Sequence, residues 1–219
     1  MITLPGRLVV FEGVEGAGKT TQLQLLGRAL DARGVAYDPF REPGGTLIGD
    51  QIRALLLDPA SQIGPEAEAL LFMASRAQLI SERVKPALAR GHIVLLDRFF
   101  LSTYAYQVRA RRLPEEAVRR ANALACAGLV PDLTVLLRLS AVDGMDRVGR
   151  RGAHDRMESE SASFHARVEG AFAEFDDPAW QAAHPEAGRI VSIDAAGTPA
   201  AVAERVWQVV AAACPEVQA

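Results

Sequence analysis

The sequence predicts an α/β fold, a three-layer α/β/α sandwich built on a five-stranded parallel sheet. Two observations predict it. Short apolar runs have the length of buried strands, and the stretches between them are long enough to hold crossover helices. The composition, 49% hydrophobic and 23% charged, is typical of a globular protein. A chain of 219 residues can bury one sizeable core, so we expect a single domain over residues 1–219.

The expected strands follow one another with helical patterns between them. Residues 7–12 form the first strand, and Leu23, Leu26 and Leu30 then recur at helical spacing. Two helical patterns, separated near residues 59–65, lie between the second and third strands. The other four expected strands are residues 35–40, 93–96, 133–139 and 189–193. Ligands of such open sheets bind beyond the carboxyl ends of the strands.

A glycine-rich segment follows the first expected strand. It matches GxxxxGK[ST] and opens a helix, as the phosphate-binding loop of P-loop NTPases does. Glycine lets the backbone wrap phosphate oxygens, Lys19 supplies positive charge, and the Thr20 hydroxyl can hold Mg²⁺. A glycine-rich turn that only caps a helix is the alternative. The predicted ATP-binding residues are Gly13, Val14, Glu15, Gly16, Ala17, Gly18, Lys19, Thr20 and Thr21.

The third expected strand leads directly into Asp97 and Arg98. P-loop enzymes place a carboxylate at such a strand end to organise Mg²⁺, so Thr20 and Asp97 are the predicted metal residues. A guanidinium at this edge can bind phosphate bidentately, which makes Arg98 a candidate for catalysis and for acceptor binding. A turn-capping aspartate and a solvated arginine are the alternatives.

Charge and cysteine usage exclude several classes of function. A net charge of −3 gives no general attraction to nucleic acid, and no apolar run approaches the roughly 20 residues that span a membrane. Cys126 and Cys214 have neither zinc-ligand nor disulfide-framework spacing, and the four histidines are scattered. We therefore expect a cytoplasmic protein with small-molecule substrates, no nucleic-acid partner and no membrane partner.

Several segments together resemble bacterial thymidylate kinases. The REPGGT segment at 41–46, the DRF segment at 97–99 and the STYAYQ segment at 102–107 are similar to signatures of that family, and further similarity covers almost the whole chain. Two positions depart from the pattern. Val108 replaces a common glycine before a basic stretch to residue 112, and Arg138 stands where an acidic residue is common.

The resemblance implies roles for particular residues. Glu15 would contact the acceptor's 3′-hydroxyl, and Arg41 and Arg98 would bind its phosphate. Phe72 would stack on thymine, Arg76 and Thr103 would bind the polar edge of the base, and Tyr106 would crowd the 2′ position. Ser102 and Gln107 complete the implied acceptor site. Core packing for Phe72 and Tyr106, and a snorkelling side chain for Arg76, are the alternatives.

Residues 147–158 resemble the helical lid that closes over ATP in nucleotide kinases. The P-loop has no arginine at residues 14–17, so the resemblance implies that the lid supplies the cation for the transferring phosphoryl group. Arg151 is the first candidate and Arg147, which could instead lie along the adenine, the second. Arg150 and Arg156 are open to a reading as solvated charges. The predicted catalytic residues are thus Lys19, Arg98, Arg151 and Arg147.

The implied activity is ATP- and Mg²⁺-dependent phosphorylation of thymidine monophosphate (dTMP) to dTDP, in dTTP biosynthesis, by a homodimeric enzyme. A kinase for another nucleotide or a nucleoside is the nearer alternative, because base choice depends on few contacts. A P-loop GTPase switch is the farther one. The chain has no Asn-Lys-x-Asp segment to read guanine, and a switch has no use for acceptor-binding arginines.

Overall fold

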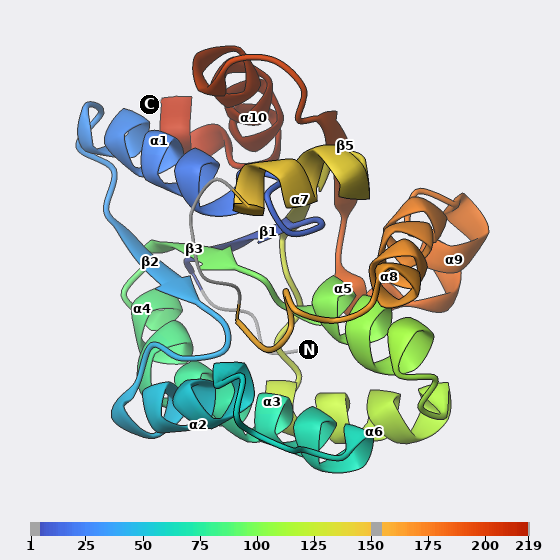
Figure 1. The fold of residues 1–219 in the computed structure, drawn as a ribbon. Coiled ribbons are helices and arrows are strands. Elements are labelled where there is room, and N and C mark those ends of the chain that lie inside the picture. Colours follow the sequence, from blue (N-terminus) through green and yellow to red (C-terminus); the bar gives the residue numbers. More distant parts are fainter. Residues whose placement is uncertain (1–4, 150–154, 219) are drawn as a thin grey trace.

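The computed structural model describes residues 5–149 and 155–218 and contains a five-stranded sheet in the order β2-β3-β1-β4-β5 (Figure 1). Every neighbouring pair of strands is parallel. The strands are β1 (Arg7–Glu12), β2 (Tyr37–Arg41), β3 (Ile93–Asp97), β4 (Leu133–Arg138) and β5 (Ile190–Asp194). The predicted fold class is confirmed.

The expected strand boundaries differ most from the structure at β2. The strand begins at Tyr37 because Val35 still donates its N–H to the carbonyl of Leu30 at the end of the preceding helix (3.1 Å). It continues to Arg41, which is in register with Asp97 of β3. The REPGG segment therefore begins on the strand, beside the end of β3.

The helices occupy the connections between strands, as the crossover argument requires. The two patterns separated near residues 59–65 are α2 and α3. The helices are α1 (Lys19–Asp31), α2 (Leu47–Leu57), α3 (Pro65–Leu79), α4 (Lys85–Ala89), α5 (Phe100–Thr103), α6 (Glu115–Cys126), α7 (Ala141–Gly149), α8 (Ala162–Glu174), α9 (Pro178–Ala183) and α10 (Pro199–Ala213). π-Helical segments η1 (Ile80–Val84) and η2 (Tyr104–Ala110) continue α3 and α5, and short 3₁₀ turns are η3 (Pro185–Ala187) and η4 (Pro215–Gln218).

Hydroxyl side chains begin several of these helices. Thr46 accepts a hydrogen bond from the N–H of Gly49 at the start of α2, and Ser161 and Thr198 do the same for α8 and α10. Proline follows directly at the start of α3 and of α10, where its missing N–H costs nothing. Local chemistry thus fixes where these crossovers begin.

Helices cover both faces of the sheet (Figure 1). α1 and α10 pack together on one face, whereas α3, α4, α6 and η2 lie on the other. The interior strands β1, β3 and β4 carry fully buried leucine and valine on both faces, which is why they read as continuous apolar runs. Among the described residues, no helix has both the length and the apolarity that a membrane crossing requires.

The two departures from the family pattern have structural explanations. Val108 is buried within η2 and packs in the core. Arg138, at the end of β4, forms an ion pair with Asp176, which also accepts a hydrogen bond from Ser192. The partner of Arg138 thus comes from the loop after α8.

Candidate active site

The glycine-rich loop connects β1 to α1 at the carboxyl edge of the sheet. Gly16 has a φ of 70°, and a Cβ there would lie 2.1 Å from the carbonyl oxygen of Gly144 in α7. Backbone conformation and packing therefore both require glycine at this position. The loop ends at Gly18, which leaves the first N–H groups of α1 directed at whatever anion the loop encloses.

Lys19 is buried with its ammonium inside the loop. Its Nζ donates to the carbonyls of Gly13 (2.9 Å) and Val14 (2.8 Å). Burial, together with the nearby positive charge of Arg98, lowers the pKa of Lys19 to about 8. The side chain therefore remains cationic at pH 7 but opposes folding there, and that penalty fades as the pH rises from about 8 toward 10.5. A bound phosphate would offset the same penalty.

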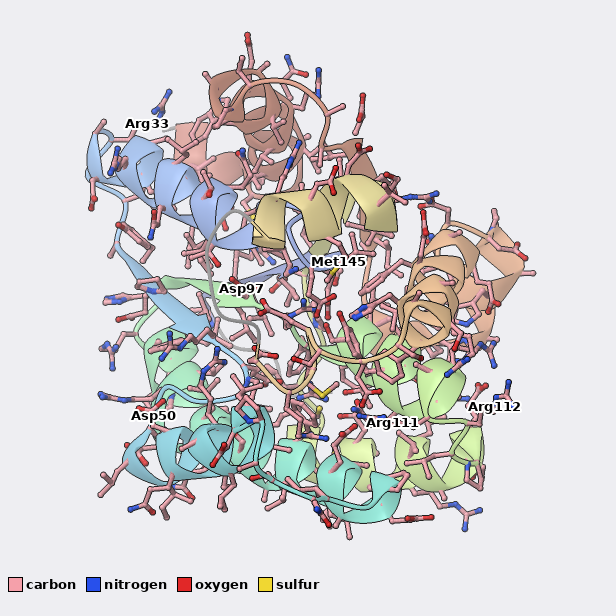
Figure 2. The ribbon with its side chains drawn as sticks, viewed as in Figure 1. Arg33, Asp50, Asp97, Arg111, Arg112 and Met145 are labelled. Carbon is pink, nitrogen blue, oxygen red and sulfur yellow. The ribbon has the colours of Figure 1, made fainter. Side chains whose placement is uncertain are left out.

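Thr20, in the first turn of α1, contacts Asp97 at the end of β3. The Thr20 hydroxyl donates to Oδ2 of Asp97 at 2.6 Å. Asp97 lies near the centre of the molecule, whereas Arg33 and Arg112 lie at its periphery (Figure 2). Hydroxyl and carboxylate oxygens are ligands that suit Mg²⁺. In the part of the chain that the structure describes, no three His, Cys, Asp or Glu side chains gather as metal ligands.

Arg98 joins the loop to the segment after β3. Its guanidinium donates to Glu15 (3.1 Å), Ser102 (3.0 Å) and the carbonyl of Gly13 (3.3 Å). Burial lowers the pKa of Arg98, but the adjacent Tyr106 and carboxylates raise the pKa by more than burial lowers it, so the guanidinium stays charged. Its φ of 71° is left-handed, a strained conformation that hydrogen-bonded neighbours hold in place.

Glu15 and Tyr106 form a second contact in this cluster. The Tyr106 hydroxyl donates to Glu15. Burial raises the pKa of Glu15, but the charges of Arg98 and Lys19 lower it more strongly. Burial, despite the charge of Arg98, raises the pKa of Tyr106. Glu15 is thus an ionised acceptor and Tyr106 a neutral donor.

Glu12, the last residue of β1, positions the segment that follows β3. Its role was not predicted from the sequence. Its buried carboxylate accepts from the N–H groups of Phe99 (2.7 Å) and Ser102 (3.0 Å) and from the Ser102 hydroxyl (2.6 Å). It reads in the sequence only as the last residue of a strand. Its effect is to fix the turn that carries Arg98.

Arg76 is fully engaged with protein groups. Its guanidinium donates to Glu42, Thr103, Asn122 and the carbonyl of Phe99 at 2.5 to 2.9 Å. A second nitrogen, Nη2, lies 2.6 Å from Glu42 in an ion pair. Together these contacts use every N–H donor of the side chain. Only 3% of the side chain is exposed, so the snorkelling alternative is wrong. Arg76 ties α3 to the REPGG segment and to α5.

A cavity of about 740 Å³ is lined both by residues of the glycine-rich loop and by residues of the REPGGT, DRF and STYAYQ segments. The predicted residues that line it are Glu15, Gly16, Lys19, Thr20, Arg41, Phe72, Arg76, Asp97, Arg98, Ser102, Thr103, Tyr106 and Gln107. Phe72 is half-buried there, one helical turn before Arg76, rather than packed in the core. Tyr106 lines the cavity and also belongs to the core.

The remaining predicted residues lie elsewhere. Gly13, Val14, Ala17, Gly18 and Thr21 belong to the loop and the start of α1 and are not among the residues that line this cavity. Arg147 donates to the carbonyl of Gly16 (3.3 Å) and lines a second cavity of about 310 Å³ with Leu139 and Gly197. Arg151, with residues 150–154 of the predicted lid, lies outside the described residues.

The cavity wall also includes residues that the sequence analysis did not assign. Arg53 of α2 lies near Arg41, and burial together with that neighbouring charge lowers its pKa. Asp155, Met157 and Glu158 line the same cavity from the carboxyl-terminal end of the predicted lid. No local motif marks Arg53, which looks like any polar residue of an amphipathic helix.

The chain is similar in sequence and in structure to known proteins. A family model described as thymidylate kinase matches residues 11–205. The thymidylate kinase of Deinococcus radiodurans is 43% identical over 205 residues, which cover 94% of this chain and 96% of the relative. That of Carboxydothermus hydrogenoformans is 46% identical over 167 residues, 76% of this chain and 82% of the relative.

A solved structure is similar over nearly the whole chain. The crystal structure of thymidylate kinase from Ehrlichia chaffeensis superposes with a TM-score of 0.72 at 27% identity, covering 94% of this chain and 98% of that one. Sequence and fold thus point to the same family.

Proposed function

The chain belongs to the thymidylate kinase family and is an ATP-dependent dTMP kinase, and we propose which of its residues carry out that reaction. One observation supports the proposal most. A single cavity is lined both by the phosphate-binding loop and by Arg41, Phe72 and Arg98. A donor phosphate at the loop and an acceptor at the arginines would therefore face each other without an intervening wall.

The ATP end of the site is the loop of residues 13–21. Its backbone N–H groups and Lys19 would hold the β- and γ-phosphates, while Arg147, beside the second cavity, would lie along the adenine or reach the phosphates. The acceptor phosphate is already anionic, so the residues need to position two anions rather than remove a proton.

The acceptor end is the opposite part of the cavity. Arg41 and Arg98 would bind the dTMP phosphate, Glu15 the 3′-hydroxyl, and Phe72 the face of the base. Arg76 and Thr103 would meet its polar edge. Because every N–H donor of Arg76 has a protein partner, we expect a base carbonyl to share a donor with Thr103 or Asn122. Tyr106 would restrict the 2′ position, with Ser102 and Gln107 completing the wall.

Thr20 and Asp97 fit a Mg²⁺ site. Both present oxygen donors, 2.6 Å apart, in the cavity beside Lys19, and Mg²⁺ in such sites is held by few protein oxygens together with phosphates and water. The ion would neutralise negative charge on the phosphates of ATP. The Thr20 hydroxyl would hold the ion, and Asp97 would help to organise it by binding the ion or one of its waters.

Replacing Asp97 tests this assignment. We expect Asp97→Asn to raise the Mg²⁺ concentration for half-maximal rate about tenfold or more, because a neutral amide is a poor ligand for a hard cation. Asp38→Asn is the matched control, since Asp38 lies on the neighbouring strand but pairs with Arg90 and His92. An unchanged Mg²⁺ dependence in Asp97→Asn rates would remove Asp97 from the metal site.

The proposal includes a lid over residues 147–158 that closes on bound ATP and supplies Arg151 to the transferring phosphoryl group. Closure would exclude water, which separates transfer to dTMP from hydrolysis. We also place the enzyme in the cytoplasm, where ATP and dTMP are available. Cell fractionation that finds the protein elsewhere would contradict that placement.

A homodimer is the expected assembly, formed by the outer face of α2, α3 and α6. The large exposed apolar side chains on this face are Leu47, Ile48, Leu55, Leu70 and Leu124. Such a patch on neighbouring helices is typical of a protein–protein interface.

A charge on this face should separate the protomers. Leu124 is 84% exposed, and we expect Leu124→Glu to sediment as a monomer at micromolar concentration while the wild-type chain sediments as a dimer. Val142→Glu is the control, because Val142 is 72% exposed on α7, away from this face. A monomeric wild-type chain would contradict the assignment.

A further inference from the structure

Glu68 is a fully buried carboxylate near the start of α3, behind the wall of the active-site cavity. It lies one helical turn before Phe72 and two turns before Arg76, on the same side of the helix. A buried carboxylate is unfavourable unless charged donors surround it. Its partners therefore indicate what this residue does.

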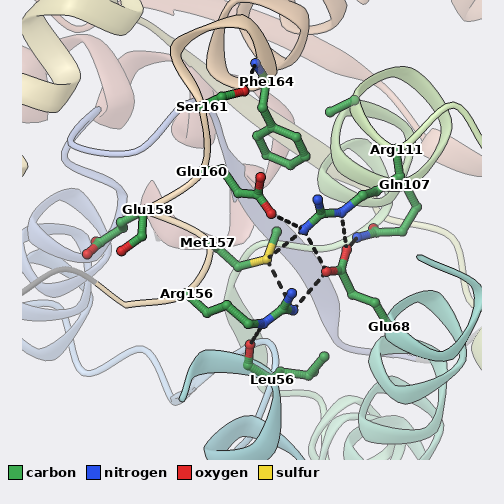
Figure 3. Close-up of polar contacts among 12 residues, drawn as sticks. Leu56, Glu68, Gln107, Arg111, Arg156, Met157, Glu158, Glu160, Ser161 and Phe164 are labelled. Carbon is green, nitrogen blue, oxygen red and sulfur yellow. Dashed lines mark hydrogen bonds and ion pairs between the residues drawn. The ribbon is translucent and has the colours of Figure 1, made fainter. Parts of the chain in front are cut away.

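Two arginines and an amide converge on Glu68 (Figure 3). Oε1 accepts from Gln107 (3.2 Å) and from Nε of Arg111 (3.0 Å), whereas Oε2 accepts from Nη2 of Arg111 (2.8 Å) and of Arg156 (2.7 Å). Burial raises the pKa of Glu68, but the hydrogen bonds and charges of both arginines lower it more. The carboxylate is thus ionised at physiological pH.

Arg156 connects this buried carboxylate to the end of the lid. Its side chain is only 11% exposed, so its reading as a solvated charge is wrong. Besides Glu68, its Nε donates to the carbonyl of Leu56 (2.7 Å) and its backbone N–H to that of Leu57 (3.0 Å). The chain at Arg156 is therefore held to the end of α2 as well as to α3.

The residues next to Arg156 reach the active-site cavity. Asp155, Met157 and Glu158 line the active-site cavity, and Figure 3 shows Glu158 directed away from the Glu68 cluster. Asp155 closes the turn by accepting from the N–H groups of Met157 (2.8 Å) and Glu158 (2.9 Å). Fixing Arg156 thus sets the position of three cavity residues and of the point where the lid ends.

We propose that Glu68 is a positioning residue that acts through Arg156, fastening the carboxyl-terminal end of the lid to the helix that carries Phe72 and Arg76. This inference rests on the lid proposed for residues 147–158. An anchored Arg156 holds Asp155, Met157 and Glu158 in place at the cavity wall, and without the anchor these residues would shift relative to the bound nucleotides.

A pair of neutral variants tests the contact. We expect Arg156→Gln and Glu68→Gln each to lower kcat about tenfold or more, because small misplacements of catalytic groups have effects of this size. The dTMP Kd of Arg156→Gln should stay within about threefold of wild type, since that variant leaves Glu68 bound to Arg111 and Gln107. The double variant should be no slower than the slower single one, because both remove one contact.

A measurement without catalysis follows the anchor directly. Proteolysis requires local opening of the chain, so trypsin should cut after Arg156 about tenfold faster in Glu68→Gln than in wild type, as read by mass spectrometry. Asp132→Asn is the control. It removes a carboxylate that binds Arg7 and the N–H of Leu8 at the opposite edge of the sheet, and it should change neither kcat nor this cleavage.

Several results would overturn the proposal. These are a kcat within about twofold of wild type in Arg156→Gln, a double variant whose losses multiply, or a dTMP Kd that weakens as much as kcat falls. If Glu68→Gln does not fold, Arg156→Gln decides alone by its kcat and Kd. Normal turnover in Arg151→Ala would instead contradict the lid itself, and trypsin cleavage after Arg156 would still report whether the anchor exists.

Discussion

Arg151→Ala is expected to turn over on the order of a thousandfold more slowly than the wild-type chain while binding dTMP with nearly unchanged affinity. The phosphate-binding loop carries no arginine at residues 14–17. Lys19 lies beneath the loop, donating to the carbonyls of Gly13 and Val14. We therefore expect the lid to supply the cation on the outer side of the transferring phosphoryl group, where it would act mainly in the transition state.

Neighbouring arginines provide the controls for this result. Arg150→Ala should be close to wild type if that residue is only solvated. Arg147→Ala should mainly weaken ATP binding, because Arg147 contacts the carbonyl of Gly16 beside the second cavity. Single-turnover rates with saturating ATP and dTMP separate these effects. An unchanged rate in Arg151→Ala, with the loss appearing in Arg147→Ala, would transfer the catalytic role to Arg147.

Arg98→Met is expected to lower kcat/KM for dTMP on the order of a thousandfold. The change would remove the bidentate donor that we propose for the acceptor phosphate. It also leaves Glu15 without the guanidinium that lies 3.1 Å away and lowers its pKa. An ionised Glu15 that has lost its guanidinium partner would repel the incoming dianion, so binding and turnover should both suffer.

Two further variants, Arg98→Lys and Arg90→Met, serve as controls for that loss of activity. Lysine keeps the charge but not the planar fork, so Arg98→Lys should recover only part of the activity. Arg90 is 55% exposed and pairs with Asp38 before β3, away from the cavity, so Arg90→Met should be near wild type. Steady-state kinetics over dTMP concentration give all of these values. A kcat/KM within about tenfold of wild type in Arg98→Met would contradict the role of Arg98.

Those parts of the site whose geometry follows from local sequence spacing could be predicted from the sequence. The loop of residues 13–20 is one turn between a strand and a helix, so its spacing alone defines its geometry. Asp97 could be assigned because carboxyl ends of parallel strands share one edge, and the structure brings it to 2.6 Å from Thr20. Phe72 and Arg76 share a helix face for a similar reason.

Contacts between distant segments could not be predicted in this way. Arg156 looks solvated within a run of charges, yet its partner Glu68 is 88 residues away in sequence. The partners of Arg76 come from three other segments, at Glu42, Thr103 and Asn122. Such pairs form only when helices pack against one another, and no single-sequence periodicity reports which helices do.

The most direct test of the central claim is ADP release with ATP and Mg²⁺, with the acceptor supplied in turn as dTMP, dUMP, dCMP, UMP, AMP, GMP, thymidine or none. Chromatography identifies the product. We expect ADP release to depend strongly on dTMP and dTDP to form in equal amount, with the other acceptors far slower. Preferential phosphorylation of another acceptor, or ADP release that needs no acceptor, would contradict the assignment of this chain as a dTMP kinase.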